Sequence, residues 1–206
     1  MQHSQSIIRR LAEIYTLSDC KDPLARSVHL PHAYSTLRYA RLLWGNELPD
    51  SLAIAAFAHD RDRIFEADVV KKSDFPPTLE GVWKYKGATA KKGAKLLCKD
   101  LKRLLPAPMV DDIAYLVLRH EEGGERKDTI LLEKSDSTKT YNLNYGADIL
   151  READALSFFD FMQLYEQHRG QEETGIKTKY SFERLGSKSF AVLNEKRPDL
   201  VLEYLK

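Results

Sequence analysis

Apolar residues recur at intervals of three and four along most of the chain, which is the spacing of an amphipathic helix, and period-two alternation is almost absent. This pattern predicts an all-α fold without strands. The expected helices cover Ser6–Leu17, His32–Trp44, Ser51–Arg63, Leu79–Leu105, Met109–His120, Gly146–His168, Phe182–Glu195 and Pro198–Leu205. Two polar stretches, Ala67–Thr78 and Glu125–Tyr145, are expected to be surface loops. The longer one is typical either of a lid or of a dispensable insertion.

The helix expected over Ser51–Arg63 has no hydrophilic face, because Leu52–Ala58 contains no polar residue. A helix that is apolar on all sides belongs in the middle of a domain. It runs directly into His59 and Asp60, so it carries an imidazole and a carboxylate into or beside the core. Burying either group without a partner costs several kcal/mol. We therefore expect other groups to meet them.

Further polar groups occupy inward positions on three of the other expected helices. His32 lies at the core boundary near the start of its helix. His120 continues an apolar stripe of 3-4-3 spacing, and Asp154 lies between Leu150 and Phe158 on one helix face. Each has a structural alternative: an inward His is often a hydrogen-bonded core residue, and Asp154 can pair with an arginine or cap a helix.

Composition and charge narrow the function classes. The 206 residues are 43% hydrophobic and 31% charged with a net charge of +1, which favours one soluble globular domain and gives no strong nucleic-acid signal. No signal peptide or membrane span is recognisable, so a cytoplasmic location is expected. Cys20 and Cys98 are isolated, which argues against a disulfide framework and a thiolate zinc site. A basic ridge is either a solvated face or an electrostatic funnel for an anion; its residues are Lys91, Lys95, Lys99 and Arg103.

His32, His59, Asp60 and Asp154 together form a mixed nitrogen and oxygen ligand set. Two imidazoles and two carboxylates suit one divalent metal ion such as Mn, Fe, Co, Ni, Zn or Mg. The order H…HD…D on an all-helical chain resembles the HD superfamily of metal-dependent phosphohydrolases over about Pro31–Tyr165. The matching segments are HAYSTLRYA, AAFAHDRDR and LREADALSFF. The segments HDRDR, RHEEGG and LREADALSFF are also similar to those of an uncharacterised bacterial branch of that superfamily.

The resemblance implies a single-domain helical bundle of the HD-domain type over residues 1–206, with a core at about 24–170 and the terminal helices packed on it. It implies that His32, His59, Asp60 and Asp154 bind the metal, with His120 as an extra ligand. Many HD enzymes carry a further His on the next helix, where this chain has Thr89. A mononuclear site is therefore expected, unless His120 and Glu121 contribute to a second one.

The implied activity is hydrolysis of a small phosphate ester or nucleotide, in which a divalent ion orients a phosphate oxygen and acidifies water. Asp60 or Glu121 would then accept the proton of the water. The residues expected to offset phosphate charge, each of them also readable as an ordinary surface charge, are Arg61, Arg63, Lys86 and Lys177. One alternative is a non-catalytic HD-like metal-containing module that binds a nucleotide or protein. Another is a helical interaction domain without metal. A homo-oligomer is compatible with all three interpretations.

Overall fold

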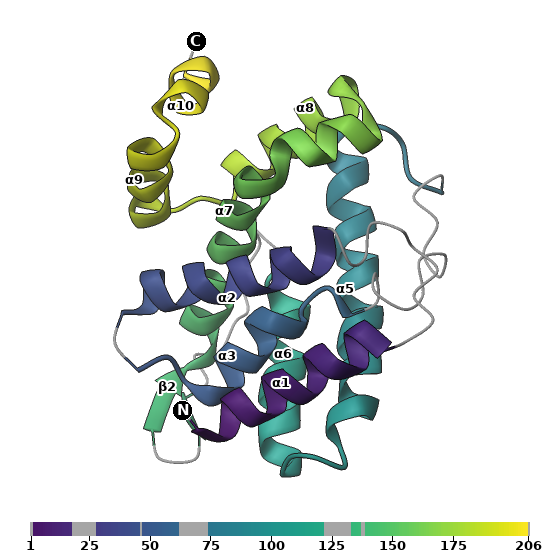
Figure 1. Ribbon diagram of the computed structural model, residues 1–206, viewed down its shortest axis with the longest axis vertical. Coiled ribbons are helices and arrows are strands. Elements are labelled where there is room, and N and C mark those ends of the chain that lie inside the picture. Colours follow the sequence, from purple (N-terminus) through teal and green to yellow (C-terminus); the bar gives the residue numbers. More distant parts are fainter. Residues whose placement is uncertain are drawn as a thin grey trace.

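The computed structural model describes residues 2–17, 28–45, 47–61, 74–121, 133–136 and 139–205, and these form an all-α bundle with one short hairpin (Figure 1). The helices of the first half are α1 (Gln2–Leu17), α2 (Leu30–Trp44), α3 (Asp50–Ala58), α5 (Leu79–Leu101) and α6 (Ala107–Arg119). The second half contains β1 (Glu133–Asp136), β2 (Lys139–Asn142), α7 (Leu143–Arg169), α8 (Gln171–Phe182), α9 (Ser187–Lys196) and α10 (Pro198–Tyr204).

Helix α3 lies at the centre of the bundle, as its lack of a polar face predicts. Every side chain from Ser51 to Ala58 is buried, and α1, α2, α6 and α7 all pack against this helix. One hydrophobic cluster runs from Ile7 on α1 through α3 to Val201 on α10. The residues that follow α3 are therefore held at a fixed position between its neighbours.

Helix α7 runs along α2 and also contacts α3, α6 and α8. Gly170 ends α7 with a φ of +83°, a backbone conformation that side chains disfavour. The chain then turns into α8, which packs against α7 and α5 at the end of the molecule opposite the hairpin (Figure 1). This turn brings a late segment of the chain over α5 and α7 and toward His120 and Glu121, which follow α6.

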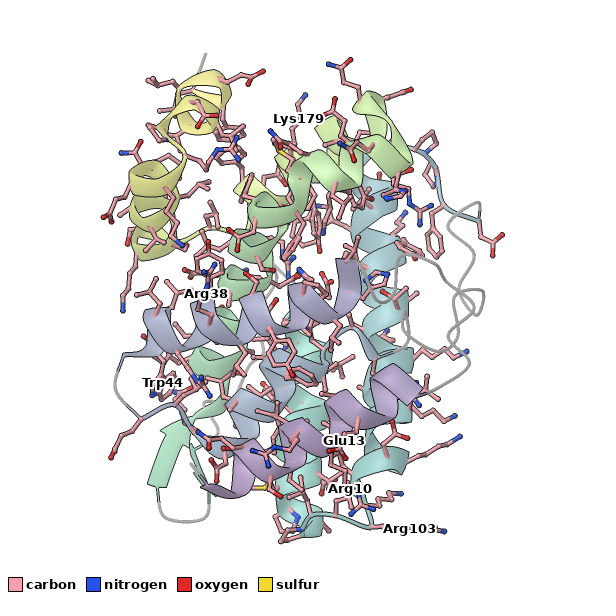
Figure 2. All side chains as sticks on the ribbon, viewed as in Figure 1. Arg10, Glu13, Arg38, Trp44, Arg103 and Lys179 are labelled. Carbon is pink, nitrogen blue, oxygen red and sulfur yellow. The ribbon has the colours of Figure 1, made fainter. Side chains whose placement is uncertain are left out.

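The α9–α10 pair is fastened to the bundle by polar contacts with α2. Lys196 Nζ donates to Tyr39 Oη at 3.1 Å, and Lys188 Nζ donates to the carbonyl oxygen of Leu43 at 2.5 Å. Tyr39 and Arg38 in turn donate to the Asp160 carboxylate of α7 at 2.9 and 2.8 Å. Figure 2 shows Arg38 on the edge of α2 nearer to α9. The terminal pair is thus tied into the α2–α7 contact.

The sequence pattern predicted the fold class correctly and located every described helix except α8. The helix expected over Phe182–Glu195 is divided, because α8 ends at Phe182 and α9 begins at Ser187. Helix α3 ends at Ala58 and α5 at Leu101, both earlier than expected. The polar stretch Gly170–Lys179 lies almost wholly within helix α8, for which no helix was predicted. Of the two expected loops, residues 67–73, 125–132 and 137–138 lie outside the described part of the chain.

The expectation of a fold without strands is wrong in one place. Strands β1 and β2 pair antiparallel, with Glu133 opposite Asn142 and Asp136 opposite Lys139. Strands of four residues are too short to show a period of two, although Thr140 and Tyr141 are residue types that favour extended backbone. The hairpin leads directly into α7.

The basic ridge and the hydropathy of the helices concern the surface of the molecule. The basic ridge of α5 and the turn after it is solvated, because Lys91, Lys95, Lys99 and Arg103 are all exposed. Among the described helices, none combines the length and the hydropathy that crossing a membrane requires.

Candidate metal centre

Three elements that are distant in the sequence bring His32, His59 and Asp154 together in the interior. His32 is on α2, His59 follows α3 and Asp154 is on α7; their exposed fractions are 9, 1 and 1%. His32 Nε2 lies 3.2 Å from His59 Nε2 and 3.0 Å from Asp154 Oδ1, and His59 Nε2 lies 3.3 Å from the same oxygen. The three atoms form a nearly equilateral triangle.

The hydrogen bonds of the outer ring nitrogens determine which tautomers are present. His59 Nδ1 lies 3.0 Å from the carbonyl oxygen of Ala56, which can only accept, so Nδ1 carries the hydrogen. Ser157 Oγ lies 2.8 Å from the carbonyl oxygen of Asp154, 2.9 Å from Thr36 Oγ1 and 2.8 Å from His32 Nδ1. When its single hydrogen goes to the carbonyl oxygen, which can only accept, Ser157 accepts from His32 Nδ1. In both neutral imidazoles Nε2 is left with its lone pair.

Three atoms with lone pairs thus point at one another, which is repulsive unless a cation lies between them. With metal–ligand bonds of about 2.1 Å, neighbouring ligand atoms are about 3.0 Å apart in an octahedron and about 3.4 Å apart in a tetrahedron. The observed separations of 3.0 to 3.3 Å fall in this range. His32, His59 and Asp154 therefore have the composition and spacing to hold a metal ion.

A proton on one imidazole is the alternative cation. Burial lowers the pKa of both rings, but at His59 the carboxylates of Asp60 and Asp154 outweigh it, and the pKa lies above its ordinary value of 6.5. At His32 burial prevails and the pKa is lowered. The cation between the three atoms is therefore either a metal ion or a proton on His59. The metal content of the protein distinguishes the two, whereas the geometry does not.

Asp60 borders the same triangle. Its side chain is buried, and Oδ2 lies 3.6 Å from His32 Nε2 and 3.7 Å from His59 Nε2. These separations are longer than those to Asp154. The structure thus brings together all four residues that the HD resemblance implies as ligands, with Asp60 at the outer edge.

Arg184 pairs with the other oxygen of Asp154. An arginine partner is the alternative to metal binding that the sequence left open for this carboxylate. Nη1 lies 2.5 Å from Asp154 Oδ2, and Nη2 donates to the carbonyl oxygen of His120 at 3.2 Å. Burial favours the protonated carboxyl, but Arg184 and Lys86 outweigh it and hold the pKa of Asp154 well below its ordinary value. Asp154 is therefore ionised, and its Oδ1 faces the two imidazoles.

His120 and Glu121 form a second group with Asp154, whose ligand atoms lie within 4.8 Å of one another. His120 Nδ1 lies 2.5 Å from the carbonyl oxygen of Val117, so it carries the hydrogen and Nε2 has the lone pair. This Nε2 has no hydrogen-bond partner among the described residues and lies 3.5 Å from Glu121 Oε1. His120 is thus oriented as a ligand would be, beside the first group.

The Glu121 carboxylate is already occupied by cations and a hydroxyl group. Lys86 Nζ donates to Oε1 at 2.5 Å, Tyr180 Oη donates to Oε2, and Arg184 Nη2 lies 3.5 Å from Oε2. Burial raises the pKa of this carboxyl, but Lys86 and Arg184 outweigh it and hold the pKa well below its ordinary value. A carboxylate held in this way is a poor proton acceptor.

The four basic residues expected to meet phosphate are in different situations. Lys86 is buried against Glu121, and Arg61 donates through Nε to Asp100 on α5 at 2.5 Å. Arg63 lies outside the described residues. Lys177, on α8, lies with Nζ 4.7 Å from the centroid of the Tyr180 ring, beside Lys86 and Arg184. The structure therefore places Lys86 and Lys177 at the cluster and Arg61 in a pair with α5.

Sequence reasoning did not select Arg184, Ser157 or Tyr180. Lys177, Tyr180 and Arg184 are spaced by three and four, so they continue one face of α8 into the turn after it. Ser157 follows Asp154 by three residues on α7. Both spacings are visible in the sequence. Polar residues at helical spacing are also common on solvated faces, however, so these residues cannot be recognised as part of a site until the neighbouring helices are known.

Comparison of the chain with protein-family models, with curated proteins and with solved structures found no match. The resemblance to the HD superfamily consequently depends on the motif residues, and the functional argument depends on the geometry around His32, His59 and Asp154.

Proposed function

We propose that the protein is a metal-dependent phosphohydrolase that acts on a small phosphate ester or nucleotide. The observation that supports this most strongly is the triangle of His32 Nε2, His59 Nε2 and Asp154 Oδ1, whose separations of 3.0 to 3.3 Å suit ligands of one ion. The H…HD…D order of the ligands supports the same class. A divalent ion bound there supplies Lewis acidity toward a phosphate oxygen and toward water.

Different side chains bind the ion, accept the proton and stabilise the phosphoryl charge. His32 and His59 present neutral nitrogens, each oriented through its Nδ1 hydrogen bond. Asp60 is the carboxylate that accepts the proton of the attacking water, because Glu121 is occupied by Lys86, Tyr180 and Arg184. Buried cations beside the site stabilise the negative charge that develops on the phosphoryl group.

The test is the metal content of untagged protein by elemental analysis, followed by phosphate release from a panel of mononucleotides and sugar phosphates with Mn, Co or Mg. We expect about one divalent ion per chain and turnover that chelation abolishes and metal restores. Asp154→Asn is the inactive control. Protein that holds its ion but releases no phosphate from any compound in the panel would contradict the hydrolase.

A non-catalytic metal-containing module that binds a nucleotide or protein is the second candidate, and the state of Glu121 favours it. A site built for hydrolysis gains from a free proton acceptor, whereas this carboxylate accepts hydrogen bonds from Lys86 and Tyr180 and is ion-paired with Arg184. This candidate predicts that Asp154→Ala lowers the melting temperature sharply and that wild-type protein binds its ligand without turnover. Calorimetry with a nucleotide panel, read beside the phosphate assay, distinguishes the two.

A further inference from the structure

Three cationic side chains surround one aromatic ring next to the candidate metal centre. Lys177 Nζ, Arg184 Cζ and Lys86 Nζ lie 4.7, 5.0 and 6.0 Å from the centroid of the Tyr180 ring. Lys86 is ion-paired with Glu121, and Arg184 is paired with Asp154 and Glu121. Lys177 has no ion pair or side-chain hydrogen bond with any residue that the structure describes. It is the one member of the group that has no acidic partner among the described residues.

The Lys177 ammonium group lies in a partly buried, aromatic environment that does not neutralise its charge. Its side chain is half-buried, and Nζ lies over the Tyr180 ring and 5.5 Å from the centroid of the Phe158 ring. Aromatic faces attract an ammonium group but do not neutralise it. Burial and the nearby Lys86 lower the pKa of Lys177 well below its ordinary value. A bound anion would offset the charge repulsion and provide acceptors for the three N–H groups.

The charges around the site indicate which anion fits. Asp60, Asp154 and Glu121 contribute three negative charges, and Lys86 and Arg184, which pair with Glu121 and Asp154, contribute two positive ones. With a divalent ion the cluster carries one positive charge in excess, and Lys177, which a bound anion holds in its protonated form, raises the excess to two. A phosphate monoester is a dianion above its second pKa of about 6, whereas a diester is a monoanion.

We propose that Lys177 binds the terminal phosphate of the substrate and selects dianionic phosphate monoesters over monoanionic diesters. This inference rests on the proposed phosphohydrolase function and specifies its substrate class. Lys177 acts there as a binding residue, since it contacts the substrate oxygens rather than water. Removing its charge reduces the excess to one, which matches a diester.

The chain offers a matched control on the same helix. Lys179 is two residues from Lys177 on α8, and its side chain is exposed at the outer end of the molecule (Figure 2). Lys179→Met makes the same chemical change as Lys177→Met and leaves the Tyr180 cluster intact. Lys177→Arg keeps the positive charge, and Lys177→Gln serves as a second neutral variant whose amide tolerates partial exposure.

The experiment is calorimetric titration of the metal-loaded full chain at pH 8 with inorganic phosphate and, separately, with dimethyl phosphate. We expect wild type to prefer phosphate. Lys177→Met and Lys177→Gln should weaken phosphate binding about 10- to 100-fold, the effect of one charge-assisted hydrogen-bonded contact. Binding of dimethyl phosphate should change much less. Lys179→Met should match wild type, and Lys177→Arg should keep the preference.

Turnover provides the second readout. The ratio of kcat/KM for a nitrophenyl monoester to that for a bis-nitrophenyl diester should fall by a similar factor in the neutral Lys177 variants only. If folded Lys177 variants hydrolyse and discriminate as wild type does, the inference is overturned and the hydrolase proposal stands. If metal-loaded wild type binds neither anion and hydrolyses neither ester, both are overturned.

Discussion

Arg184 donates to the oxygen of Asp154 that the imidazoles do not contact. Nη1 lies 2.5 Å from Oδ2, whereas Oδ1 lies 3.0 Å from Nε2 of His32 and 3.3 Å from Nε2 of His59. The guanidinium group therefore orients the carboxylate and keeps it ionised. In many metal sites a cation outside the ligand set holds a ligand carboxylate in this way, which makes Arg184 the first residue to test.

Arg184→Met should destabilise the fold by about 3–5 kcal/mol, since it leaves Asp154 and Glu121 buried without their shared cation. Chemical denaturation measures the change. Arg197→Met is the control, because Arg197 pairs with Asp199 at the surface, and should have little effect. Equal stability of the two variants would show that Arg184 does not compensate these carboxylates.

Ser157→Ala should lower metal affinity about 10- to 100-fold by removing the hydrogen bond that fixes the His32 ring and its tautomer. Competition with a chelator measures the affinity. Ser35→Ala is the matched control at the same α2–α7 contact, because Ser35 donates to Asp160 rather than to an imidazole. If both variants bind metal as wild type does, His32 is not a ligand oriented by Ser157.

Lys86→Met should cost about 3–5 kcal/mol, because it leaves Glu121 short of its closest cation in the interior. Glu121→Gln in the same chain should recover part of this loss, since the amide oxygen can still accept from Tyr180. A double-mutant cycle of unfolding free energies gives the coupling. Additive losses would contradict a direct ion pair between the two side chains.

The pH dependence of Cys98 alkylation should follow its environment on α5. Burial, and then the charge of Asp111, raise the pKa of the thiol above its ordinary value of 9.0. A raised pKa means less thiolate at pH 8, so iodoacetamide should react slowly and the rate should rise through an inflection above pH 9.0. The measurement uses a Cys20→Ser background, with the urea-unfolded chain as reference. An inflection at or below that of the unfolded chain would contradict the assignment.

The spacing of residues along each helix determined which side chains point inward. The all-apolar Leu52–Ala58 segment predicted a central α3, and helical periodicity predicted the buried positions of His120 and Asp154. These predictions hold because the pitch of a helix relates sequence spacing to a face without any knowledge of its neighbours. The same reasoning missed hairpin β1–β2, where the strands are too short for a period to be visible.

What a buried group contacts was decided only by how the helices cross. Arg184 is one of 32 basic residues, and its pairing with Asp154 depends on the turn at Gly170 that carries α8 over α7. The packing of α5 against α6 pairs Lys86 with Glu121, and α8 leaves Lys177 without an acidic partner among the described residues. The sequence alone thus determined the helical faces and the ligand types, whereas the tertiary structure decided the ion pairs, because each joins side chains from elements that are distant in the sequence.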